Sequence, residues 1–151
     1  SGLDNANLVE TYGANARVPF AFPRTKTLRA IPSDERRADG MLTTVKHDFR
    51  RASIAALSKH SNLTIMEPLS PNSTQMVIYL MTARLATENS ISIEDAKRDA
   101  IFVNESGQDE DLAAACSIQE TVTAQGNSHL TFGLFEKAIV NFHSNLTASL
   151  K

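Results

Sequence analysis

The stretch MLTTVKHDFRR, Met41 to Arg51, separates into two unlike faces when it is read as a β-strand. Successive side chains of a strand point to opposite sides. One face is mainly apolar or neutral and holds Met41, Thr43, Val45, His47 and Phe49. The other carries two cations and holds Leu42, Thr44, Lys46, Asp48 and Arg50. The pattern predicts a strand that packs on the protein with one face and shows cations on the other.

The composition predicts a single domain over residues 1–151. A hydrophobic content of 42% is ordinary for a soluble globular chain. No apolar run approaches the roughly 20 residues that span a bilayer, and the start SGLDNANLVE lacks the pattern of a signal peptide. Cys116 is the only cysteine, so an internal disulfide is excluded.

The net charge of -2 conceals an uneven distribution. Residues 1–59 hold ten Lys/Arg and six Asp/Glu, a net +4, which leaves -6 for residues 60–151. Such a split favours one part that faces a polyanion and another that faces elsewhere. Mixing of the charges on folding is nearly as good an explanation, because halves of a sequence are not surfaces.

The N-terminal third predicts hairpins. NLVETYGANARVPFAF reads as two strands around Gly13-Ala14-Asn15, residues that suit a hairpin turn. Pro19 and Pro23 cannot donate ladder hydrogen bonds, so the second arm is expected at an edge. Thr25 to Ile31 is expected to form a strand, joined to the opening stretch by the solvated loop PSDERRADG.

The middle of the chain is less distinct. Ala52 to Lys59 fits a helical turn or a strand equally well, and Asn62 to Met66 a short strand that precedes a turn at Pro71-Asn72-Ser73. Thr74 to Leu85 is apolar on both faces, which favours a strand buried on both sides, although a helix is also compatible. Ser92 can cap a helix over Ile93 to Ala100. After it we expect a strand at Ile101 to Val103, an acidic loop at Glu105 to Asp111, and a strand within Ala113 to Ala124.

The end of the chain predicts an amphipathic helix that starts at Ser128 or Thr131. Its apolar stripe consists of Leu134, Phe135, Ala138, Ile139, Phe142 and Leu146. Strands followed by a terminal helix, without βαβ alternation, indicate an α+β fold with an antiparallel sheet.

No catalytic, nucleotide-binding or metal-binding motif occurs, so neither a cofactor nor a metal is expected. A pairing of Cys116 with a histidine is conceivable for catalysis, but a small buried thiol is the better interpretation. His47 is interpreted as a structural histidine of its strand. The run Asp109-Glu110-Asp111 is interpreted as a solvated loop.

The cationic face of the opening strand suits phosphate contacts. Thr44, Lys46 and Arg50 would lie there, and Tyr79 would offer a stacking surface for an unpaired base if it reaches the same face. Solubility is the plain alternative explanation for these side chains.

The order of these parts resembles the coat proteins of single-stranded RNA bacteriophages. The residues that carry the resemblance are NLVETYGANARVPFAF, TKTLRAI with MLTTVKHDFRR, TQMVIYLMTARL, CSIQETVTAQ and HLTFGLFEKAIVNFHSNL. The resemblance implies an N-terminal hairpin, a sheet of about five strands, and a C-terminal helix that clasps a second copy. The segment from Ser92 to Gly107 has no counterpart in that pattern.

The resemblance further implies a non-enzymatic shell protein that self-assembles from dimers and packages single-stranded RNA. The expected RNA contacts are Thr44, Lys46, Arg50, Tyr79 and Arg84. The expected dimer helix uses Leu134, Phe135, Ile139, Phe142 and Leu146. The implied partners are the chain itself and RNA, without a membrane or a small-molecule substrate, in the virion and, during assembly, the host bacterial cytoplasm. The alternatives are a small interaction module or effector that binds a host protein through its acidic C-terminal half, and a small enzyme that uses Cys116 or a histidine.

Overall fold

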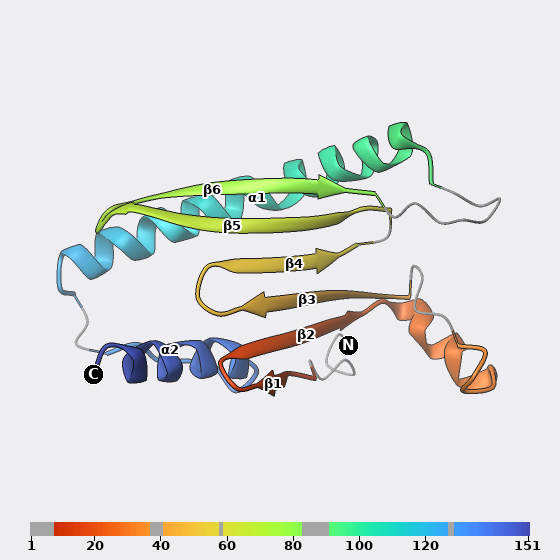
Figure 1. Cartoon of the computed structure of the whole chain (residues 1–151), viewed down its shortest axis with the longest axis horizontal. Helices are drawn as coiled ribbons and strands as arrows, with labels where there is room; N and C mark the ends of the chain where they lie inside the picture. Colours follow the sequence, from red (N-terminus) through yellow and green to blue (C-terminus); the bar gives the residue numbers. More distant parts are fainter. Residues whose placement is uncertain (1–7, 37–40, 58, 83–90, 127–128) are drawn as a thin grey trace.

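The computed structural model describes residues 8–36, 41–57, 59–82, 91–126 and 129–151. Its centre is one antiparallel sheet whose six strands follow each other in chain order (Figure 1). The strands are β1 (Glu10–Tyr12), β2 (Asn15–Ala21), β3 (Leu42–Asp48), β4 (Ala52–Ala56), β5 (Ser61–Ser70) and β6 (Ser73–Met81). With the helices that follow, this confirms the α+β class, the antiparallel sheet and the N-terminal hairpin. The sheet has six strands, where about five were expected.

The N-terminal hairpin turns at Gly13, whose φ of 61° is easily reached by glycine. The expected edge position of its second arm was wrong, because β2 lies between β1 and β3. Pro19 is tolerated there because β1 pairs only with Asn15 to Arg17, while Pro19 stands opposite Thr44 of β3. The ladder between β1 and β2 therefore stops at Arg17 and does not extend to Pro19.

The segment after the hairpin corrects a second prediction. Thr25 to Ile31 was expected to be a strand, but it belongs to a 3₁₀ helix, η1 (Pro23–Ala30). Pro23 suits the first position of this helix, since its fixed φ fits a helical turn and its missing N–H costs no bond there. In the loop PSDERRADG, residues 37–40 lie outside the described residues.

The opening strand is confirmed as β3, although it ends at Asp48 instead of Arg51. Of residues 52–59, for which two interpretations were open, 52–56 form strand β4, while residue 58 lies outside the described residues. β5 and β6 are joined by a turn that contains Pro71 and Asn72. Thr74 to Leu85 was expected to be a strand buried on both sides, and residues 83–85 of this range lie outside the described residues. Within the described residues β6 is the last strand of the sheet, and Met76, Tyr79, Leu80 and Met81 are all exposed.

Residues 93–123 form one long helix, α1 (Ile93–Thr123), which Ser92 caps as predicted. The strand expected at Ile101–Val103, the loop at Glu105–Asp111 and the strand within Ala113–Ala124 were therefore wrong. Ile118 and Val122, which suggested alternation, are four residues apart and so also share one face of a helix. The helix ends where Gln125 adopts a φ of 52°, and the amides of Gln125 and Gly126 bond back to Val122 and Thr121, as in a Schellman motif.

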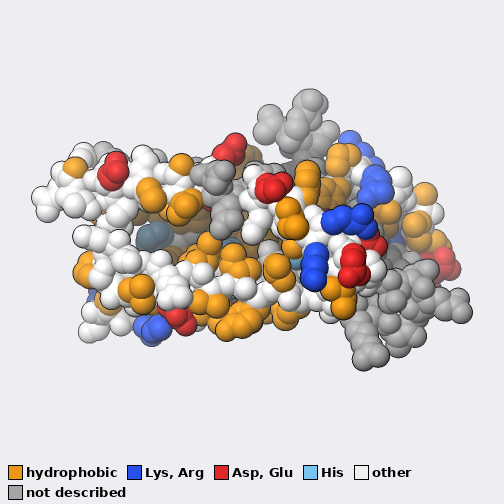
Figure 2. All heavy atoms as spheres, turned by 90° about the horizontal axis from the view of Figure 1, so that it is seen from above, with side chains coloured by type: hydrophobic (Ala, Val, Ile, Leu, Met, Phe, Trp, Pro, Cys, Tyr) orange, Lys and Arg blue, Asp and Glu red, His pale blue; other side chains and the backbone are white. Residues whose placement is uncertain are grey.

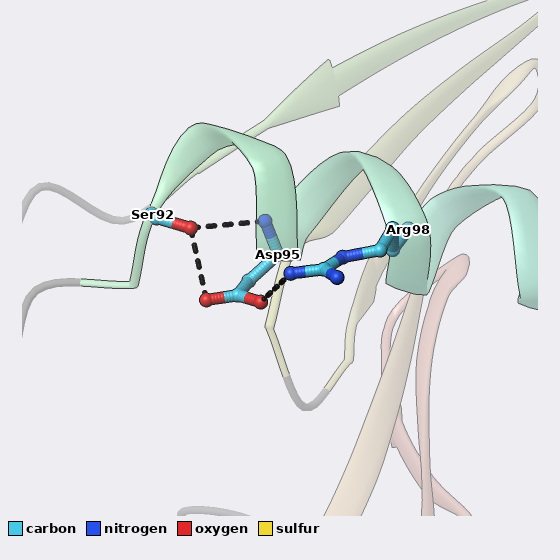
Figure 3. Close-up of polar contacts among 3 residues, drawn as sticks. All are labelled: Ser92, Asp95 and Arg98. Atoms are coloured by element: carbon cyan, nitrogen blue, oxygen red, sulfur yellow. Dashed lines mark hydrogen bonds and ion pairs between the residues drawn. The ribbon is translucent and has the colours of Figure 1, made fainter.

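The cap of α1 leads to a first prediction. The Ser92 hydroxyl accepts a hydrogen bond from the amide of Asp95 at 3.0 Å and donates one to its carboxylate at 2.9 Å (Figure 3). Replacing Ser92 with Ala should therefore lower the free energy of unfolding by about 1 kcal/mol in chemical denaturation. Ser92→Asp, which keeps an acceptor, should recover most of that loss. Equal stability of Ser92→Ala and the parent would contradict the assigned cap.

The same variant should change the titration of Asp95. The hydrogen bond from Ser92, and after it that from Arg98, hold the pKa of Asp95 below its ordinary value of 3.8. Because the folded pKa is lowered, the resulting stabilisation is present above 3.8 and is lost as the pH falls through the folded value. In an NMR titration, Ser92→Ala should move the Asp95 midpoint upward.

The terminal helix is α2 (Lys137–Ser149), which begins later than the expected Thr131, while Ser128 lies outside the described residues. Leu134 and Phe135 thus precede the helix instead of belonging to its stripe. α2 packs on the start of the sheet, where the ring of Phe142 meets that of Phe49 edge-on at 5.6 Å. The Asn141 amide donates to the carbonyl of Gly13 at 3.2 Å. Within the described ranges, no helix is long and apolar enough to cross a membrane.

The chain buries little of its apolar surface by itself. Its accessible surface is 11990 Å², whereas a folded monomer of 16.5 kDa is expected to expose about 7,600 Å². The buried apolar side chains in the described part are Ala16, Val18, Ala96 and Ala100. α1 lies behind β5 and β6 (Figure 1), yet it exposes Ile101, Phe102, Leu112, Ile118 and Val122.

Candidate nucleic-acid interface

The strand register brings five side chains into one row across the sheet. Lys46 of β3 stands opposite Arg17 of β2 on one side and Ile54 of β4 on the other. Ile54 in turn stands opposite Leu63 of β5, and Leu63 opposite Tyr79 of β6. Residues paired in this way share a face of the sheet. The row therefore places two cations at one end and an exposed tyrosine at the edge strand.

This row lies on the uncovered face of the sheet. The opposite face is the one that packs, since Thr43 of β3 and Ala16 and Val18 of β2 are buried there. α2 meets that covered face through the contact of Phe142 with Phe49. In Figure 1, α1 passes behind the sheet and no helix crosses in front of it. We call the uncovered side, which carries Arg17, Lys46 and Tyr79, the open face.

The structure places the predicted contact residues unequally. Thr44 and Lys46 both lie on the open face, two residues apart in β3, and Tyr79 shares it through the register. Arg50 lies beyond the end of β3 in the turn to β4, where its guanidinium carbon is 5.5 Å from the centre of the Phe49 ring. Arg50 is thus exposed at the rim and does not belong to the row. Arg84 lies outside the described residues.

A hollow opens on the open face beside the N-terminal hairpin. The side chains that line it on this face come from four neighbouring strands, β1 to β4: Tyr12, Asn15, Arg17, Lys46, Asp48 and Ile54. We call it the hairpin hollow. Sequence reasoning missed Tyr12 and Arg17, because only the pairing of β1, β2 and β3 brings them next to Lys46.

Two side chains of the hairpin hollow bind the carboxylate of Glu10, which stands on β1 opposite Arg17 of β2. One oxygen of Glu10 accepts hydrogen bonds from the Arg17 guanidinium and, at 3.0 Å, from the Tyr12 hydroxyl. The bond from Arg17, and after it that from Tyr12, lower the pKa of Glu10 below its ordinary value. Lys46 has no ion pair among the described residues. The hollow therefore contains a cation and a phenol that already hold one oxyanion, beside a second cation.

The arrangement offers the chemistry of single-strand binding. Cations and hydroxyl donors on a surface bind phosphate oxygens, and exposed tyrosine rings such as those of Tyr12 and Tyr79 stack on bases. Among the described residues, no group of His, Cys, Asp and Glu is arranged to hold a metal ion. Cys116 was expected to be buried, but it is exposed on α1, because the residues around it form part of a helix that this chain leaves largely uncovered.

Comparison with known proteins adds no family to this description: no family model, no curated protein and no solved structure matches the chain.

Proposed function

We propose that the chain is the coat protein of a virus-like shell, which assembles from dimers and packages single-stranded RNA against its open face. The observation that carries the proposal is the pairing of a bare, cation-bearing sheet face with a large apolar surface that one copy cannot cover. A family resemblance supports the same proposal in part: coat proteins of RNA bacteriophages also have an N-terminal hairpin, an antiparallel sheet and C-terminal helices, whereas TKTLRAI and CSIQETVTAQ, which the resemblance took as strands, are helical here.

The uncovered area is large enough for an obligate interface. The chain, with 11990 Å² accessible, exceeds the expectation for a monomer of its mass by roughly 4,400 Å². Obligate homodimer interfaces bury about 2,000–5,000 Å² summed over both partners, or about 1,000–2,500 Å² from each, and are rich in apolar groups. Much of the exposed apolar surface belongs to β6 and α1, and Figure 2, which views the chain from the β6 side, shows hydrophobic side chains along it with a hollow between its layers.

The edge strand supplies a geometry for the dimer. Among the strands of the described residues, β6 is the terminal one and pairs with β5 on one side only. An exposed strand edge is a template for pairing with another chain. Antiparallel pairing of β6 with β6 of a second copy would continue the sheet across a two-fold axis, because a two-fold interface uses the same surface twice. The open faces of both copies would then form one surface for RNA, and α1 of each copy could cover the other.

The first experiment is size-exclusion chromatography of the chain expressed in bacteria, with absorbance read at 260 and 280 nm. The proposal expects megadalton particles whose absorbance ratio shows packaged nucleic acid and whose nucleic acid is removed by ribonuclease after disassembly. A monomer or small oligomer with the absorbance of clean protein would overturn it and would favour the interaction module.

The open face gives a second prediction, on RNA content. Lys46→Glu should reduce the packaged RNA several-fold, because the reversal removes a phosphate contact and adds repulsion at the middle of the face. Arg50→Glu, at the rim, should have a smaller effect. Both side chains are exposed, so stability should change by less than about half a kcal/mol.

The matched control for this prediction is Lys26→Glu, which makes the same charge change on η1, a helix that extends beyond the end of β2 (Figure 1). It should package RNA like the parent. If Lys46→Glu and Lys26→Glu package equal amounts of RNA, the assignment of the open face is wrong.

A further inference from the structure

The hairpin hollow contains a second cation, Lys46, and an exposed aromatic ring, Tyr12, in addition to the ion pair of Arg17 with Glu10. Arg17 and Lys46 stand directly opposite each other on neighbouring strands, a like-charge arrangement that is unfavourable unless an anion lies nearby. Glu10 supplies such an anion for Arg17. Lys46 forms no ion pair among the described residues, although the carboxylate of Asp48 lines the same hollow, and the ring of Tyr12 is exposed beside them. Of the two cations in the site, Arg17 is thus the one with a direct ion pair among the described residues.

We propose that the hairpin hollow is a nucleotide-binding site at the N-terminal hairpin, in which Arg17 and Lys46 hold one phosphodiester of single-stranded RNA, Tyr12 stacks on the adjoining base, and Glu10 competes with that phosphate for Arg17. The proposal rests on the proposed function and extends it. It assigns RNA contacts to the first two strands, at the end of the sheet opposite β6.

The position of each group supports this division of roles. Glu10, Arg17 and Lys46 are paired in register across β1, β2 and β3, so the carboxylate and both cations lie side by side. A phosphate can accept from the same guanidinium that now donates to Glu10. Asp48 lies two residues from Lys46 on the same face and stands opposite Ala52 of β4, whereas Lys46 stands opposite Arg17 of β2. The Asn15 side-chain oxygen accepts from the amide of Phe49 at 2.9 Å, which fixes that end of the hollow as structure.

The competition gives opposite expected effects for the two partners of one ion pair. Removing the cation with Arg17→Gln should weaken binding of RNA about threefold to fivefold and reduce the slope of log K against log salt by about 0.7. Removing the competitor with Glu10→Gln should tighten binding by a similar factor. If the ion pair had only a structural role, both variants would destabilise the hairpin, and RNA affinity would change in the same direction in both.

The measurement is fluorescence anisotropy of a labelled oligouridylate, titrated at several salt concentrations with the purified full-length chain below its assembly concentration. Tyr12→Leu should weaken binding about fivefold or more through loss of stacking, whereas Tyr12→Phe should bind nearly like the parent. Circular dichroism of each variant shows that the hairpin still folds, as expected for exposed side chains.

A second exposed ion pair provides the control. Arg98 donates to Asp95 at 2.7 Å on the first turns of α1 (Figure 3), away from the open face. Arg98→Gln and Asp95→Asn make the same two charge changes there and should leave RNA affinity unchanged. If Arg17→Gln, Glu10→Gln and Tyr12→Leu behave like these controls while Lys46→Glu still loses RNA, this inference is overturned and the proposed function stands. If the parent chain binds no oligouridylate and forms no RNA-containing particle, the proposed function itself falls.

Discussion

Replacing Leu80 with Glu is expected to convert the assembled protein into monomers. Leu80 lies on the covered-face side of β6 and is 57% exposed in the single chain. In the proposed dimer it would be buried twice, once in each copy. Each site would lose about 2–3 kcal/mol of apolar burial and would place an unpaired carboxylate in a dry interface, so the dissociation constant should rise by about a thousandfold or more.

The measurement is size-exclusion chromatography with light scattering. A second variant tests whether the loss of assembly extends beyond β6 to α1. Phe102→Glu changes the side chain on α1, which is 70% exposed, and should have the same result. Leu8→Glu is the matched control, since Leu8 is 63% exposed but lies next to β1, at the opposite edge of the sheet. Particles of normal size from both Leu80→Glu and Phe102→Glu would remove the proposed interface.

A second large effect is expected at the point where α1 is anchored to the sheet. The His60 side chain is 2% exposed and its Nδ1 lies 2.8 Å from a carboxylate oxygen of Asp99 on α1. The same oxygen accepts from the backbone amide of Lys59 at 3.2 Å. Among the described residues His60 Nε2 is buried without a partner, so Asp99 is the hydrogen-bond partner of the ring there. One carboxylate thus joins the helix to the β4–β5 turn.

Asp99→Ala should therefore cost about 1–3 kcal/mol of unfolding free energy, because it leaves a second nitrogen of a buried imidazole unsatisfied. The loss is measured by chemical denaturation of the assembled protein. Hydrogen exchange should also speed up at the amides of the first turns of α1, near the buried Ala96 and Ala100. Asp99→Asn retains an acceptor and should lose less unfolding free energy. Lys97→Ala, at an exposed position of the same helix, serves as the control. Equal exchange in Asp99→Ala and Lys97→Ala would refute the anchor.

Sequence reasoning succeeded where one residue pattern has one structural solution. The alternation of side chains from Thr43 to Asp48 predicted β3 and its two faces, and Phe49, which contacts Phe142 of α2, was expected to face a helix. Gly13 predicted the position of the first turn. The capping function of Ser92 was also evident, because a serine followed by acidic residues has a local structural consequence.

It failed where two periods fit the same residues or where partners distant in sequence decide. Ile118 and Val122 satisfy both alternation and a helical stripe, and nothing local distinguishes them. Thr25 to Ile31 has strand-like composition, but residues 25–30 belong to η1, which begins at Pro23. The roles of Tyr12 and Arg17 depend on the register with Lys46, which is a property of three strands together.

The consecutive strand order described above bears on how a subunit forms during translation. Every strand of the sheet pairs with the one made immediately before it, so the sheet can grow by short-range steps as the chain emerges from the ribosome, and such local topologies fold quickly. β6 is made last among the strands, and α1 follows it. The exposed edge of β6 is therefore completed only after the other five strands have been synthesised. This order shortens the time in which an incomplete chain can pair with the wrong partner.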